Sequence, residues 1–112
     1  MKRIAYAEEW LTTDDRVADL VLEYARALAR SETADTITIP VVEGNLVRHA
    51  QFLIGPASQI IVVESDEPSP VGLEADIAVA DLEARLQRLK MPQPVAYDDD
   101  PPFELPAELP EV

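Results

Sequence analysis

The sequence predicts a small α+β domain in which two helices pack on one face of an antiparallel sheet of three to four strands. Three observations predict it: a helical stripe over residues 13–30, a β-hairpin over residues 36–54, and a second helical stripe within residues 73–90. We expect the order (β)αβββα in a single domain, residues 1–90. Residues 91–112 hold six prolines, and we expect them to form an acidic tail that is extended or disordered.

The first helix is predicted after Thr13, whose hydroxyl can cap it, and two aspartates follow at the positive end of the helix dipole. Its apolar residues recur at helical spacing and make one stripe: Val17, Leu20, Val21, Tyr24 and Leu28. Before it, residues 4–6 are a candidate short strand. Trp10 and Leu11 then follow as an apolar staple onto the start of the helix.

A β-hairpin follows, because Gly44-Asn45 is a two-residue turn pair in which glycine supplies the positive φ of a type II′ turn. This turn sets the register of the two strands, with Glu43 opposite Leu46. Alternation then gives a core face made of Ile37, Ile39, Val41, Ala50, Phe52 and Ile54. The opposite face is mixed, and its apolar residues include Val42, Val47 and Leu53.

Pro40 indicates where this hairpin lies in the sheet. In the derived register it lies opposite His49, at a position whose N–H would point away from the partner strand. A proline is tolerated there when no further strand pairs on that side. We therefore expect residues 36–42 to be the sheet edge, with residues 46–54 inside it.

Two further elements complete the predicted fold. Residues 58–65 read as a third strand, and the unbroken apolar run from Ile60 to Val63 indicates a central position beside the N-terminal strand. A loop leads to the second helix, whose stripe is Val79, Leu82, Leu86 and Leu89. The start of this helix stays open, because Asp76 and Asp81 are both suitable caps.

Composition narrows the classes of function. The net charge is −13 and the tail has six acidic residues and no basic one, so nucleic acid and anionic membranes are not expected partners. Without cysteine the chain has no disulfide and no thiolate zinc site. Because no signal peptide or membrane span is recognisable, we expect a cytoplasmic protein. The excess of arginine over lysine indicates a bacterial genome rich in G and C.

One short motif suggests an activity. Arg48-His49-Ala50 resembles the active-site motif of the histidine phosphatases, in which the histidine takes up the phosphoryl group. That chemistry needs a second histidine and further arginines around the phosphate, and His49 is the only histidine of this chain. We therefore assign no phosphatase activity and expect His49 to be a partly exposed sheet histidine.

Other polar clusters lack the partners that a site requires. Asp98–Asp100 are three successive carboxylates in a proline-rich segment, so they point in different directions rather than converging on a metal ion. Residues 64–67 are acidic without a histidine, and residues 55–58 lack the lysine and the following helix of a phosphate loop. We assign no catalytic, cofactor-binding or metal-binding residue.

The tail has the most distinctive pattern, because its apolar residues alternate with proline and glutamate as in extended segments that dock into a groove. Four states stay open for it: docking on its own domain, exchange between two subunits, docking on another protein, and disorder.

We expect a non-enzymatic protein–protein interaction module that forms a homodimer or binds another protein. Its expected contacts are the apolar residues of the mixed sheet face and of the tail: Val42, Val47, Leu53, Phe103, Leu105 and Leu109. Two alternatives stay open. One is a small-ligand-binding protein or enzyme that uses the seam between helices and sheet, and the other is an acidic inhibitor of a basic protein.

Overall fold

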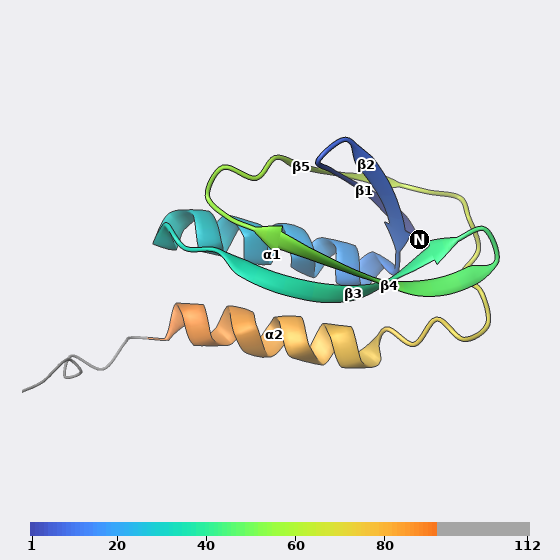
Figure 1. The fold of residues 1–112 in the computed structure, drawn as a ribbon. Coiled ribbons are helices and arrows are strands. Elements are labelled where there is room, and N and C mark those ends of the chain that lie inside the picture. Colours follow the sequence, from blue (N-terminus) through green and yellow to red (C-terminus); the bar gives the residue numbers. More distant parts are fainter. Residues whose placement is uncertain (92–112) are drawn as a thin grey trace, which may run out of the picture.

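The computed structural model of this chain describes residues 1–91 (Figure 1). Five strands form one antiparallel sheet in the order β4-β3-β2-β1-β5, and two helices complete an α+β fold. The elements are β1 (Lys2–Tyr6), β2 (Glu9–Thr13), α1 (Asp15–Ser31), β3 (Asp35–Glu43), β4 (Leu46–Ile54), β5 (Ile60–Glu64) and α2 (Asp76–Lys90). The α+β class is confirmed, whereas the strand number and the element order are not. No helix of residues 1–91 is long and apolar enough to cross a membrane.

The prediction of three to four strands fails at the N-terminus, where the chain folds into the hairpin β1–β2. Leu11 lies opposite Ile4 and Trp10 opposite Ala5, so the predicted staple is in fact a strand. The turn residues Ala7 and Glu8 have φ of 52° and 68°, as in a type I′ turn. Such turns favour Asn-Gly, so Ala-Glu gives no recognisable turn signal in the sequence.

This turn holds two side chains in the left-handed region, which costs roughly 1 kcal/mol for each residue that has a Cβ. We therefore expect the double substitution Ala7→Asn, Glu8→Gly to raise the free energy of unfolding by about 1–2 kcal/mol. Urea unfolding followed by circular dichroism measures the change. The single substitution Glu8→Gly should give about half of it, and a loss of stability in both variants would contradict the type I′ turn.

The second hairpin has the predicted register. Glu43 lies opposite Leu46, Ile39 opposite Ala50, and Gly44 has a φ of 63°. Ile37, Ile39 and Ile54 are at most 1% exposed, which confirms them as core residues. A two-residue turn and strict alternation are both local features, and this explains why the sequence alone was sufficient here.

The position of this hairpin in the sheet was predicted the wrong way round. The edge strand is β4, and β3 lies inside because it meets β2 at Thr12 and Val42. The missing N–H of Pro40 still limits strand pairing on this side, since the contact between β2 and β3 stops short of residue 40. Beyond it, side chains replace strand pairing: the Thr13 hydroxyl donates to the Pro40 carbonyl at 2.6 Å, and Arg85 donates to the Thr36 carbonyl at 3.3 Å.

Strand β5 lies beside the N-terminal strand, as predicted, but it is an edge rather than a central strand. Its apolar run suggested burial on both faces. Ile60 and Val62 face the core and are half-buried, whereas Ile61 and Val63 are 59% and 42% exposed. The run therefore has two different environments, one of which is open.

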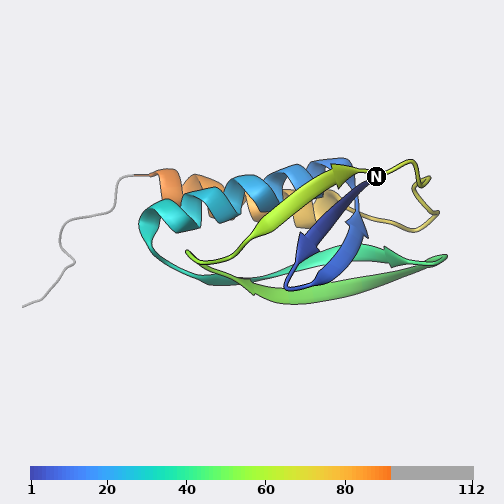
Figure 2. The same cartoon turned by 90° about the horizontal axis from the view of Figure 1, so that it is seen from above.

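The core lies between the sheet and the helices, which run side by side on one side of the sheet (Figure 2). Its buried members come from both layers: Ile4, Val17, Ala18, Leu20, Val21, Tyr24, Leu28, Ile37, Ile39, Val41, Ile54, Ala78, Leu82 and Leu86. The cap of α1 is Asp14, whose carboxylate accepts from the backbone N–H of Arg16 and Val17. Thr13, the predicted cap, ends β2 instead. Neither suggested cap of α2 is at the cap position: Ala75 occupies it, Asp76 is the first residue of the helix, and Asp81 lies within it.

Candidate interaction surface

The face of the sheet that points away from the helices carries a group of large apolar side chains. We call this group the outer patch, and it consists of Trp10, Leu53, Ile61 and Val63. These four side chains are between 42% and 59% exposed. Exposed apolar side chains that lie singly on a surface are ordinary, whereas a contiguous group marks a surface for interaction.

The strand register brings the outer patch together from three distant parts of the sequence. Ala5 on β1 pairs with Trp10 on one side and with Ile61 on the other, so these residues form a row across three strands. The next row contains Arg3, which pairs with Val63 of β5. Side chains that lie opposite each other in antiparallel strands are in direct contact range.

Arg3 fixes the position of the indole ring in this patch. Its guanidinium carbon lies 4.5 Å from the centre of the Trp10 ring, in a cation–π contact. Arginine and tryptophan are the residue types that contribute most to binding at protein interfaces. Because the contact is formed within one chain, the ring is ordered before any partner arrives.

Leu53 joins the patch through an open groove of about 660 Å³ that runs between β1, β5 and the segment following β4. Ala5, Leu53 and Ile61 line it together with the turn residues of the first hairpin. Tyr6 fixes its base, because the ring packs against Phe52 with centroids 5.1 Å apart and the hydroxyl donates to the Leu53 carbonyl. The groove therefore lies where the ends of two hairpins converge.

The three predicted contact residues of the sheet do not form one surface. Val42 and Val47 lie opposite each other and are half-buried, whereas Leu53 lies six residues further along β4, about 20 Å away at the rise of a strand. Leu53 alone belongs to the outer patch. Phe103, Leu105 and Leu109 lie outside the described residues.

Sequence reasoning missed Trp10, Ile61 and Val63. Residues 9–13 do not alternate in polarity, because Trp10 and Leu11 are adjacent, so they carry no periodic signal for a strand. For Ile61 and Val63, an apolar run does not show which of its two faces the rest of the chain covers.

His49 is exposed on β4, close to the expectation of a partly exposed sheet histidine, but its surroundings differ from those predicted. It lines a hollow of about 400 Å³ with Pro40 and Val47, to which Glu74, just before α2, and Asp81, on α2, also contribute. Sheet register alone could not reveal these acids, because they lie more than 20 residues later in the chain.

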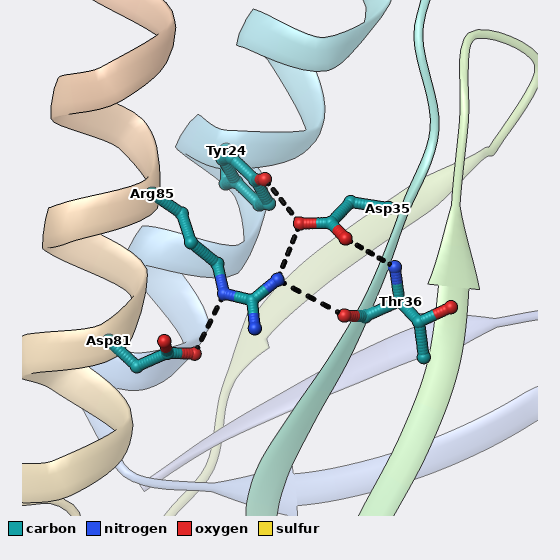
Figure 3. Close-up of polar contacts among 5 residues, drawn as sticks. All are labelled: Tyr24, Asp35, Thr36, Asp81 and Arg85. Atoms are coloured by element: carbon teal, nitrogen blue, oxygen red, sulfur yellow. Dashed lines mark hydrogen bonds and ion pairs between the residues drawn. The ribbon is translucent and has the colours of Figure 1, made fainter.

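A second polar group ties α1, β3 and α2 together (Figure 3). One carboxylate oxygen of Asp35 accepts from the Tyr24 hydroxyl at 2.5 Å and from Arg85 at 2.6 Å. The other accepts from the backbone N–H of Thr36, and Arg85 also donates to Asp81 at 2.9 Å. Both oxygens of Asp35 are thus occupied by the protein itself, which marks the group as a structural tie.

The protonation of this tie follows from its contacts. Burial and the hydrogen bond to Asp35 raise the pKa of Tyr24 to about 12, so its hydroxyl stays neutral and donates. Burial alone would raise the pKa of Asp35, but the hydrogen bonds from Tyr24 and Arg85 outweigh it and hold that pKa below its usual value. The tie is therefore formed with Asp35 ionised.

Comparison with protein-family models, with curated proteins and with solved structures finds no match for this chain.

Proposed function

We propose that this protein is a non-enzymatic interaction module that associates with itself through the surface around the outer patch. The observation that carries the proposal is the grouping of Trp10, Leu53, Ile61 and Val63, all at least 42% exposed, on one side of a rigid sheet. Removal of this area from water on association is favourable, by about 25 cal/mol for each Å².

The charge distribution favours this surface over the rest of the molecule. A net charge of −13 makes two copies repel each other at most approaches. Among the residues of β1, β2 and β5 whose side chains point to the outer face, Arg3 is the one charged residue. The residues opposite it on the neighbouring strands, Thr12 and Val63, are uncharged. Two copies can therefore meet here without carboxylates opposing each other.

Absolute mass from light scattering over a concentration series tests the proposal. We expect the full chain to approach twice its monomer mass of 12.4 kDa as its concentration rises. A chain that keeps the monomer mass at the highest soluble concentration would rule out self-association.

A pair of matched variants tests whether the outer patch is involved. Ile61→Ser should raise the dimer dissociation constant about tenfold or more, because a symmetric interface loses the apolar contact twice. Ile77→Ser is the control, since Ile77 is 79% exposed on α2, outside the patch. Equal effects of the two substitutions would show that association does not depend on the patch.

A further inference from the structure

We propose that a second copy of this chain docks on the open edge of β5. The two β5 strands pair antiparallel in a two-fold register centred on Val62, so that the two sheets become one. This inference rests on the self-association proposed above and specifies its contact, which uses Ile61 and Val63 of the outer patch and leaves Trp10 outside it. It differs from face-to-face stacking of two outer patches, which would also satisfy the proposed function.

The backbone groups available for this pairing follow from the register of β1 and β5. The Ser65 N–H donates to the Met1 carbonyl at 3.0 Å, which makes Met1 and Ser65 a hydrogen-bonded pair. Bonded and non-bonded pairs alternate in an antiparallel ladder, so Val63 and Ile61 also bond to β1. The N–H and C=O groups of Ile60, Val62 and Glu64 therefore point to the open side. Among residues 1–91, no strand pairs there.

These three residues are complementary to themselves. With the axis at Val62, the bonded pairs are Val62 with its own copy and Ile60 with Glu64 of the partner subunit, the latter formed twice. Each bonded pair exchanges two main-chain hydrogen bonds. An axis at Ile61 or at Val63 leaves one bonded pair fewer, because the strand then ends sooner on one side.

The side chains agree with this register. Ile61 lies opposite the partner's Val63 in the closer, non-bonded type of pair, and the contact is formed twice on the outer face. Glu64 is the one charged residue of β5, and it lies opposite an isoleucine rather than another glutamate. The pairing therefore brings no like charges together.

The two edges of the sheet differ in their protection. Natural edge strands are blocked by charged residues, prolines or bulges. Strand β4 carries Arg48, His49 and Gln51 along its length. The run from Ile60 to Val63 has no charged residue, proline or bulge, which is typical of an edge strand that pairs with another strand in the assembled protein.

Helix α1 offers a second apolar contact beside this edge. Arg16 and Glu23 form ion pairs with α2, and Leu22 lies roughly a third of a turn around the helix from both, so it does not face α2. Leu22 is 42% exposed. The two-fold axis of this pairing is perpendicular to the sheet. It therefore places the helices of both copies on the same side of the joined sheet, so that each α1 gives the other an apolar neighbour.

Proline substitution at the two edges is the central test. Val62→Pro removes an N–H that the monomer does not use in pairing with β1, and it blocks a further strand. Gln51→Pro is the matched control, because the N–H of residue 51 points to the open side of β4 by the same alternation. We expect Val62→Pro to raise the dimer dissociation constant about a hundredfold or more. Gln51→Pro should leave it unchanged, with circular dichroism showing both variants folded.

Cysteine cross-linking tests the register without a proline. The chain has no cysteine, so each variant with one introduced cysteine carries a single thiol. The register places Ile61 opposite the partner's Val63 with Cα atoms about 4.5 Å apart, within the range of a disulfide. An equal mixture of Ile61→Cys and Val63→Cys chains should therefore oxidise to mixed dimers faster than either variant alone. Equal rates in all three samples would overturn the register.

Two further measurements distinguish edge pairing from stacking of two outer faces and from docking of the tail. Trp10 is the one tryptophan and lies two strands from the proposed contact, so dimerisation should leave its fluorescence maximum unchanged. A shift to shorter wavelength would favour stacked faces and overturn edge pairing. The double variant Phe103→Asp, Leu105→Asp should remain a dimer, and its dissociation would identify the tail as the occupant instead. A monomeric wild type would contradict both the proposed function and this inference.

Discussion

Substitution of Ile39 by alanine is expected to lower the free energy of unfolding by about 3 kcal/mol, the typical cost of an apolar cavity in a packed core. Ile39 is fully buried on β3, between the sheet and the helices. Close packing prevents the neighbours from filling the space that the side chain leaves. Urea unfolding at a concentration at which light scattering gives a monomer measures the loss.

The matched control is Ile61→Ala on β5, which should change the same free energy by less than about 0.5 kcal/mol, as at most exposed positions. Ile61 has the same side chain but is 59% exposed in the monomer. Similar losses at both positions would mean that both faces of β5 are buried, as the apolar run suggested, and would contradict the open outer face.

Loss of the Asp35 carboxylate is the second large effect. We expect Asp35→Ala to lower the free energy of unfolding by about 2 kcal/mol, because it leaves the buried Tyr24 hydroxyl and the Arg85 guanidinium without their shared acceptor. Glu43→Ala is the control. It removes an ion pair with Arg48 whose side chains are 72% and 61% exposed, and exposed pairs contribute about 0–1 kcal/mol. Equal effects would show that Asp35 is not a tie between elements.

The same group determines part of the pH dependence of stability. The pKa of Asp35 is lower in the folded than in the unfolded state, so its contribution is present above the unfolded pKa and is lost as the pH falls through the folded pKa. The pKa of Tyr24 is raised to about 12, so its contribution is present below the unfolded pKa and is lost as the pH rises through 12. Unfolding at a series of pH values should show a smaller acid loss in Asp35→Ala, and an unchanged acid limb would assign it to other carboxylates.

The features of this fold that could be predicted are those that depend on residues close together in the sequence. The stripe of α1 and the register of β3 with β4 involve residues a few positions apart, and both were predicted correctly. The hairpin β1–β2 is equally local, but its Ala7-Glu8 turn is held by the surrounding structure rather than by the preferences of its own residues. Residues 4–6 were a candidate strand and lie in β1, but strand β2 was missed, and the tryptophan of the outer patch with it.

The interaction surface required information that no local pattern contains. Trp10, Leu53 and Ile61 come from three segments, and only the strand order β4-β3-β2-β1-β5 and the convergence of the two hairpins bring them together. The Asp35 tie likewise joins residues 11 and 50 positions apart in the chain. Neither group has a spacing that distinguishes it from chance in the sequence.

The sequence by itself determined the class of this fold, the register of its main hairpin and the acidic character of the chain, because periodicity, turn chemistry and composition act locally. The tertiary structure decided which strands are edges and which apolar residues stay exposed. Pro40 illustrates the division: its missing N–H showed that strand pairing on one side of β3 must end, but not that β2 would meet β3 first at Val42. Strand order results from the packing of the whole chain around one core, and it left β5 open at the edge of the sheet.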